Sequence, residues 1–272
     1  MTLFDELSDE LSDDDTAALT GPLCRVRMLV AYDGGPFRGF ARQPNVKTVA
    51  GTMAEAAGKV LGHRVVLTCA GRTDAGVHAW GQVVHFDTNR TGEDLDLPGL
   101  QRSLNKMLHP YVVIRAIDEA PDSFDARHSA TGRRYRYTVL RRDVPDPFLA
   151  RYAWHVEHEL DLRAMQLGCD PLFGEHDFSS FCRRPPDNGT LVRRVTDAEW
   201  SDLGDGVWRF EIAAKAFCHQ MVRSIVGTLI EVGMGRKRAG DVAAIIRSGD
   251  RRRAGQPAPP HGLCLWEVTY GT

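Results

Sequence analysis

One short stretch of this 272-residue chain combines residue types that can do chemistry from a fixed position. Between Gly71 and Gly76 lie a cation, a small hydroxyl and a carboxylate, in the order Arg72, Thr73 and Asp74. A third glycine, Gly81, follows them, and glycine adopts positive φ angles easily and lets a ligand or a second backbone approach closely. Such a loop between two strands is typical of a reactive site on a rigid sheet. The alternative is that Asp74 is an ordinary turn residue, bonded to nearby backbone N–H groups.

The residues near Asp74 limit the chemistry that it can support. A glycosidase needs two carboxylates, and no obvious second one lies near in the sequence. His78 and His85 lack a third ligand close by, so they predict a metal site only weakly. The chain has no G-x-S-x-G motif, which disfavours a serine hydrolase. A lone aspartate can still act as a covalent nucleophile, and an arginine partner would hold it ionised by lowering its pKa.

A second candidate region is the strand-like run that ends at residue 140. Arginine and tyrosine alternate in it from Arg134 to Tyr137, which places both tyrosines on one face and both arginines on the other. Two rings bordered by cations suit stacking on nucleobases, worth about 1–3 kcal/mol per base. The alternative is an amphipathic strand whose tyrosines belong to the core.

Strands and helices alternate along the whole chain and predict an α+β fold. In the first half, apolar patterning predicts the order strand, helix, strand, loop, strand, helix, strand, which is a ferredoxin-like split βαβ unit. The predicted strands of this half are 24–32, 65–69, 82–87 and 111–116, and its helices are 48–62 and 97–108. In the second half, the predicted helices are 161–172, 217–233 and 241–248, and the predicted strands are a hairpin at 191–200 and 207–215 and a last strand at 263–270.

We expect two ferredoxin- or RRM-like halves, 22–122 and 123–272, that share one mixed, mainly antiparallel sheet with flanking helices. The active site would lie in the cleft between the halves. Residues 1–21 form an acidic leader that we expect to be disordered.

Composition favours a cytoplasmic protein, and the distribution of charge is compatible with an anionic partner. The first 20 residues hold seven acidic residues and no basic one, so the remaining chain has 34 basic and 29 acidic residues. Six scattered cysteines without a C-x-x-C pair predict reduced thiols rather than zinc ligands. The sequence has no run of about 18 apolar residues, so it predicts no membrane-spanning helix. An acidic tail on a mildly basic body is compatible with nucleic acid, although scattered basic residues are more often a solvated surface.

Five blocks, in order, resemble the TruA family of tRNA pseudouridine synthases over residues 24–271. They are Tyr32-Asp-Gly with Phe37-Arg-Gly-Phe40; Ala70-Gly-Arg-Thr-Asp-Ala-Gly-Val-His-Ala with Gly81-Gln-Val-Val-His-Phe86; Phe124-Asp-Ala-Arg127 with Ser129-Ala-Thr and Arg133-Arg-Tyr-Arg-Tyr137; Phe217-Cys-His-Gln-Met-Val-Arg-Ser-Ile-Val-Gly227; and Gly262-Leu-Cys-Leu. The resemblance implies isomerisation of uridine to pseudouridine at positions 38, 39 and 40 of the tRNA anticodon stem-loop. It also implies a homodimer and no cofactor or metal.

The resemblance also implies roles for single residues. Asp74 matches the essential aspartate, Tyr135 the tyrosine that packs against the target base, and Arg223 the basic partner of the aspartate. Arg72 matches the arginine associated with base flipping. The arginines expected to contact tRNA phosphates are Arg127, Arg183 and Arg184.

The chain departs from the family pattern at Phe40-Ala41, where tryptophan and glutamine are usual, so the role of that loop is open. Three rivals remain: a pseudouridine synthase with another RNA target, a catalytically silent RNA-binding protein, and a metal-dependent phosphoesterase that uses Asp74, His78 and His85.

Overall fold

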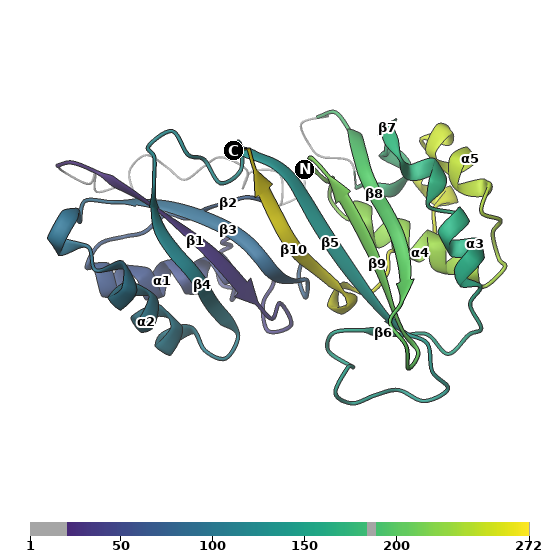
Figure 1. The fold of residues 1–272 in the computed structure, drawn as a ribbon, viewed down its shortest axis with the longest axis horizontal. Helices are drawn as coiled ribbons and strands as arrows, with labels where there is room; N and C mark the ends of the chain where they lie inside the picture. The colour runs from purple at the N-terminus through teal and green to yellow at the C-terminus, as the bar shows by residue number, and fades with distance from the viewer. Residues whose placement is uncertain (1–20, 184–188, 272) are drawn as a thin grey trace.

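The computed structural model describes residues 21–183 and 189–271, which form one ten-stranded sheet flanked by helices (Figure 1). The main path of the sheet runs β4-β1-β3-β10-β5-β9-β8-β7, with β2 paired to β3 and β6 paired to β5. Neighbouring strands are antiparallel except for the parallel pairs β3–β10 and β5–β6. The predicted leader lies outside the described residues except for Gly21, as does Arg184. None of the described helices is long and apolar enough to span a membrane.

The first half has the predicted order of elements. Its strands are β1 (Cys24–Tyr32), β2 (Thr68–Cys69), β3 (His78–Thr88) and β4 (Val112–Ala120), and its helices are α1 (Val49–Leu61) and α2 (Leu97–Leu108). The spatial order β4-β1-β3-β2 is that of a ferredoxin-like unit. Helix α1 begins where the Thr48 hydroxyl accepts from Gly51 N–H, and it ends at Gly62 in the left-handed conformation.

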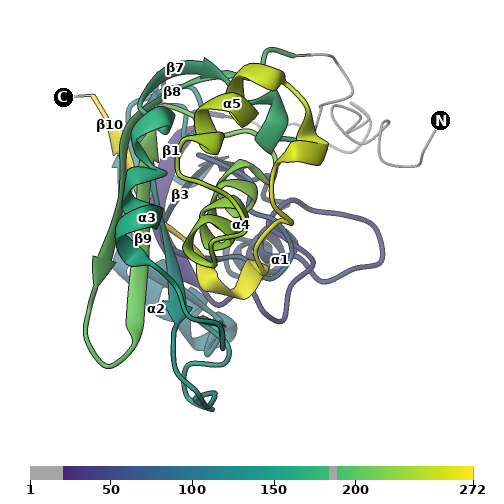
Figure 2. The same ribbon diagram turned by 90° about the vertical axis from the view of Figure 1, so that its right-hand side faces the viewer.

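The second half repeats this arrangement with additional elements. Its strands are β5 (Ala130–Leu140), β6 (Trp154–His155), β7 (Gly174–Asp177), β8 (Val192–Asp202), β9 (Val207–Ala214) and β10 (Leu263–Tyr270). Its helices are α3 (Leu162–Leu167), α4 (Met221–Gly233) and α5 (Asp241–Ser248). The spatial order β10-β5-β9-β8 matches that of the first half, strand for strand. Figure 2 shows α1, α4 and α5 on the same side of the sheet. One buried apolar cluster extends through both halves.

The two halves meet where β10 lies beside β3. Cys264 pairs with His78 and Leu265 with Ala79, directly after the loop that carries Asp74. Gly81 permits this contact, because a Cβ atom there would lie 2.3 Å from the carbonyl oxygen of Trp266. The close backbone approach that the sequence predicted for these glycines is therefore present at Gly81.

A ladder of aromatic rings and guanidinium groups also crosses this junction. The rings of Trp80 and Trp266 stack with centroids 5.9 Å apart. Arg115 lies over Trp80 at 3.9 Å, and Arg136 lies over Trp266 at 3.7 Å. Since these contacts join β4, β3, β10 and β5, they add cation–π attraction to the backbone pairing between the halves.

The structure corrects several predicted boundaries. Strand β2 begins at Thr68 rather than residue 65, and β4 continues to Ala120 rather than ending at residue 116. Strand β3 begins at His78 rather than residue 82, so the candidate loop is shorter than the sequence suggested. Helix α4 begins at Met221 rather than residue 217, because Gln220 has a positive φ of 65°. The predicted helix 161–172 is α3 followed by a separate 3-10 turn, Asp170–Leu172, which has a proline in its first turn.

Candidate active site

The loop that carries Asp74 is held by contacts along its whole length. The Gln82 side chain donates to the Gly71 carbonyl at 2.7 Å, and Phe40 N–H donates to the Thr73 carbonyl at 3.1 Å. The Thr73 hydroxyl bonds the Tyr32 hydroxyl at 2.7 Å in a buried position. These groups come from β1, β3 and the loop after β1. Asp74 is thus presented by a loop whose backbone is already positioned.

Only one of the two glycines that frame Asp74 shows a conformational requirement. Gly76 has a φ of 78°, and a Cβ atom on it would approach the Pro260 ring at 3.1 Å. Gly71 has no positive φ, and a Cβ atom there would meet nothing within 4 Å. A side chain other than hydrogen is therefore strained at Gly76 and is accommodated by the protein at Gly71.

Asp74 contacts two basic side chains of the second half. Its Oδ2 atom lies 3.3 Å from Arg223 Nη1, and its Oδ1 atom lies 3.3 Å from His219 Nε2. The Asp74 side chain is 25% exposed and that of Arg223 only 15%, whereas His219 is 47% exposed. The Arg223 pair is therefore better shielded from water than the His219 pair, so solvent weakens its attraction less.

These contacts determine the charge of Asp74. Burial alone would raise the pKa of its carboxyl group, but His219 and Arg223 lower it by more, so the net pKa lies below the usual value. The Arg223 guanidinium is charged at every relevant pH, whereas His219 contributes a charge only when protonated. The carboxylate is consequently ionised at neutral pH, as a nucleophile or a base must be.

Arg223 and His219 are positioned by the start of α4. Gln220, in the left-handed conformation, ends the preceding segment, and its side chain accepts from Arg251 at 2.5 Å. Arg223 Nε donates to the Ala258 carbonyl at 2.7 Å, and Ala258 N–H donates back to the Arg223 carbonyl at 2.9 Å. This reciprocal pair fixes the guanidinium so that its Nη1 atom faces Asp74.

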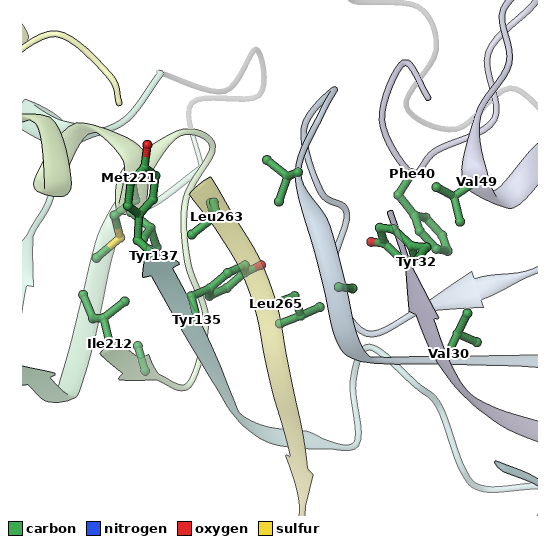
Figure 3. Close-up of a cluster of buried hydrophobic side chains, with 14 of the residues drawn as sticks. Val30, Tyr32, Phe40, Val49, Tyr135, Tyr137, Ile212, Met221, Leu263 and Leu265 are labelled. Carbon is green, nitrogen blue, oxygen red and sulfur yellow. The ribbon is translucent and has the colours of Figure 1, made fainter. Parts of the chain in front are cut away.

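Tyr135 lies near the carboxylate and Tyr137 belongs to the core. The Tyr135 side chain is 9% exposed, and its ring meets the edge of Phe217 with centroids 5.0 Å apart. Burial and the Asp74 charge raise the pKa of its hydroxyl. Tyr137 is fully buried and donates to the Pro259 carbonyl at 2.8 Å. Figure 3 shows both rings on β5 among buried side chains that include Leu263 and Leu265.

The prediction that two tyrosines bordered by cations stack on bases is therefore wrong for Tyr137, whose ring is enclosed by protein. The neighbouring arginines are on the other face, as predicted, but they are bound within the protein. Arg134 lies 2.5 Å from Asp197, and Arg136 lies 2.8 Å from Glu211.

The remaining predicted arginines do not contact Asp74. Arg72 is exposed and, within the described residues, has no hydrogen bond or ion pair. The Arg127 side chain is exposed, and its backbone N–H donates to Asp125. Arg183 is exposed, and its backbone N–H donates to the His219 carbonyl at 3.1 Å. These side chains lie on the surface, and their guanidinium groups have no hydrogen-bond partner among residues 21–183 and 189–271.

His78 and His85 use their ring nitrogens for structural hydrogen bonds. Nδ1 of His78 accepts from Gly34 N–H at 3.0 Å, and its Nε2 lies 3.1 Å from the carbonyls of Arg151 and His261. Nδ1 of His85 accepts from Ala126 N–H at 3.0 Å. Over residues 21–183 and 189–271, no group of three or more potential ligands is arranged to hold a metal ion.

Sequence reasoning did not assign a site role to His219. It lies within the block that carries Arg223, four residues earlier. The predicted helix would have placed the two side chains one turn apart, which was an available signal. The structure instead brings them together through the turn at Gln220.

Phe40, where the family usually has tryptophan, is a packing residue. Its ring is buried and lies 6.0 Å from that of Tyr32.

Known proteins resemble this chain over most of its length. Residues 169–271 match a family model described as tRNA pseudouridine synthase. Curated relatives called tRNA pseudouridine synthase A occur in Brevibacillus brevis, at 42% identity over 90% of this chain and 99% of the relative, and in Acetivibrio thermocellus, at 41% identity over 90% and 99%. A solved Cbf5–Nop10–Gar1 complex is 14% identical, covers 76% of this chain and 45% of that one, and has a TM-score of 0.32, which is too low to support an inference. On the extent of its identity to the curated relatives, this chain belongs to the tRNA pseudouridine synthase A family.

Proposed function

We propose that this protein converts uridine to pseudouridine at positions 38, 39 and 40 of the tRNA anticodon stem-loop. One observation carries the proposal: an ionised carboxylate on a fixed loop lies between Arg223 and His219 in a chain of this family. The reaction breaks the N-glycosidic bond, turns the uracil and joins its C5 atom to the ribose. It is an isomerisation, so it needs no external oxidant or reductant.

Asp74 is the proposed catalytic group. Attack on the ribose, addition to the base and removal of a sugar proton all require the ionised form, which Arg223 and His219 favour. The Arg223 guanidinium is already bonded to Ala258, so it orients the carboxylate as well as stabilising its charge. Tyr135 would pack against the target base, because its side chain lies close enough to Asp74 for the carboxylate charge to raise the pKa of the Tyr135 hydroxyl.

The substrate nucleotide must leave its stack to reach Asp74. Extrusion costs a few kcal/mol, and a cation that fills the vacated space offsets part of it. Arg72 is suited to that role, because it is exposed two residues before Asp74 and makes no ion pair in the described part of the chain. Arg127 and Arg183 are exposed cations that can bind phosphates, and we assign the same role to Arg184, which lies outside the described residues.

We further infer that the protein acts in the cytoplasm as a homodimer that binds one tRNA with both subunits. An exposed apolar side chain such as Phe148, of which 88% is accessible, is available for a subunit contact. Sedimentation equilibrium would show twice the chain mass of 30.2 kDa if this is correct, and a single chain mass would refute it.

The direct test is to incubate the purified protein with a tRNA transcript that has uridine at all three positions and to map pseudouridine by chemical modification and sequencing. We expect product at positions 38–40 and at no other uridine, with an unchanged rate in excess chelator. Product at other positions would indicate a different RNA target. Binding without product would indicate a silent RNA-binding protein, and loss of activity in chelator would indicate a metal-dependent reaction.

A further inference from the structure

Arg133 contacts three separate segments of the active-site region. Its Nη2 atom donates to the carbonyls of Ala70, at 2.8 Å, and Arg127, at 3.0 Å. Its Nη1 atom donates to the carbonyl of Lys215 at 2.5 Å. All three acceptors are backbone carbonyls, so among these groups only the Arg133 side chain depends on the type of residue present.

The places of two of these carbonyls in the sequence are informative. Ala70 lies four residues before Asp74, and Lys215 lies four residues before His219. Arg133 therefore connects the start of the loop that supplies the carboxylate to the start of the segment that supplies His219 and Arg223. Its own strand, β5, supplies Tyr135 two residues later on the same face.

The loop of Asp74 is otherwise attached to the second half mainly at its far end. There, His78 and Ala79 pair with β10. The hydrogen bonds to Gly71 and Thr73 come from Gln82, Phe40 and Tyr32, which belong to the first half. They fix the loop within its own half. The start of the loop packs at Ala70 in a small apolar cluster with Ala126 of the second half, and Arg133 supplies the hydrogen bonds that join this start to the segment before α4.

Arg133 has no other evident use for its charge. No carboxylate lies within ion-pair distance of it in the described part of the chain, although other arginines of β5 have such partners. Arg133 is half-buried, and this burial lowers the pKa of its guanidinium. Removing a cation from water costs free energy, even when three carbonyls accept its hydrogen bonds. That cost is understandable if the planar guanidinium holds the three carbonyls in a fixed arrangement.

We propose that Arg133 is a positioning residue that sets the distance between Asp74 and its partners His219 and Arg223 by joining the carbonyls of Ala70, Arg127 and Lys215. The proposal rests on the proposed function for its catalytic readout. A planar guanidinium can reach all three acceptors at once, whereas a lysine ammonium at the same position cannot. Displacement of a reacting group by about 1 Å costs about 100-fold in rate.

The test compares Arg133→Lys with Arg134→Lys, because both variants keep the net charge and change adjacent residues on opposite faces of β5. For Arg133→Lys we expect the single-turnover rate at saturating tRNA to fall by about 100-fold, while the Kd for tRNA changes less than about threefold. For Arg134→Lys we expect both quantities to stay within about threefold of the wild type. Adding millimolar guanidinium to Arg133→Ala should raise its single-turnover rate by about tenfold or more over the rate without guanidinium.

Three outcomes would overturn the proposal: a rate for Arg133→Lys within threefold of the wild type, a loss confined to Kd, or an equal rate loss in Arg134→Lys. A loss confined to Kd would make Arg133 a phosphate contact instead.

Hydrogen exchange separates this proposal from the proposed function, since it needs no activity. The amides of 71–77 and 216–220 should exchange faster in Arg133→Lys than in Arg134→Lys, and equal exchange would refute the positioning role even if the wild type made no pseudouridine. The wild type alone gives a further check that does not depend on a folded variant. Arginine-selective NMR should show slowly exchanging Nη protons for Arg133, and a freely rotating guanidinium would contradict the proposal.

Discussion

Substitution of Tyr135 separates the role of its ring from that of its hydroxyl. The ring is 9% exposed and packs against Phe217, whereas the hydroxyl has no hydrogen-bond partner within the described residues. Tyr135→Phe therefore removes no intramolecular hydrogen bond, and we expect its free energy of unfolding to change by less than about 0.5 kcal/mol. Tyr135→Ala removes a buried ring, and we expect a loss of about 3–5 kcal/mol in the free energy of unfolding.

The same two variants should differ in catalysis. A ring stacked on a base is worth about 1–3 kcal/mol, which corresponds to about 5- to 150-fold in single-turnover rate. We expect Tyr135→Ala to lose that factor and Tyr135→Phe to stay within about threefold of the wild type. Stability is measured by urea unfolding. The single-turnover rate of pseudouridine formation is measured without urea, with saturating tRNA, at a temperature where both variants are folded.

Tyr137→Phe is the matched control on the same strand and face. Its hydroxyl donates to the Pro259 carbonyl, so its removal should cost about 1–3 kcal/mol in unfolding free energy with little effect on rate. If Tyr135→Phe lost as much rate as Tyr135→Ala, the hydroxyl would be the important group and the packing argument would be refuted.

Three further predictions concern the charges of the site. Arg223→Gln should reduce the rate at pH 7 by about 10- to 150-fold, the equivalent of a hydrogen bond to a charged group. It should also shift the acid limb of the pH–rate profile to higher pH, because burial then raises the pKa of Asp74 with less opposition. An unmoved acid limb would contradict this. His219→Gln should cost less, about 1.5- to 5-fold, because its side chain is half exposed, and a larger loss than that of Arg223→Gln would reverse the ranking. The affinity for tRNA should fall with salt concentration, and Arg183→Gln should make the slope of log K against log salt shallower by up to about 1, whereas an unchanged slope would mean that Arg183 contacts no phosphate.

The Asp74 charge also links stability to pH. Its pKa in the folded protein lies below its ordinary value, so the ionised carboxylate stabilises the fold above the unfolded-state pKa. That contribution disappears as the pH falls through the folded-state pKa. Asp74→Asn should therefore be less sensitive to acid unfolding than the wild type, as measured by urea unfolding between neutral pH and the acid range.

Much of the fold follows from local sequence patterns. The boundaries of α2, α5 and β10 agree with the prediction, and those of the two helices are set by local capping signals. Asp96 caps α2 by accepting from Gly99 N–H, and Gly249 ends α5 in the left-handed conformation. The sequence also indicated that Asp74 lies on a loop between strands and that Gly81 permits a close backbone approach.

Other features depend on contacts between distant segments. The start of β3 at His78 results from its pairing with β10, which is nearly 190 residues away in the sequence. The delayed start of α4 results from the left-handed turn at Gln220, which Arg251 stabilises. The distinction between Tyr135 and Tyr137 depends on which ring the second half encloses. No local pattern contains this information, because alternation predicts the face of a strand but not what covers it.

The central claim is that Asp74 is the catalytic group for pseudouridine formation in tRNA. The most direct measurement is the yield of pseudouridine at positions 38–40 of a tRNA transcript with the wild type and with Asp74→Asn, alongside the Kd of each for the same tRNA. Asparagine keeps the size of the side chain and removes its charge. The account predicts no detectable product from Asp74→Asn and a Kd within about threefold of the wild type. Turnover by Asp74→Asn near the wild-type rate would contradict it.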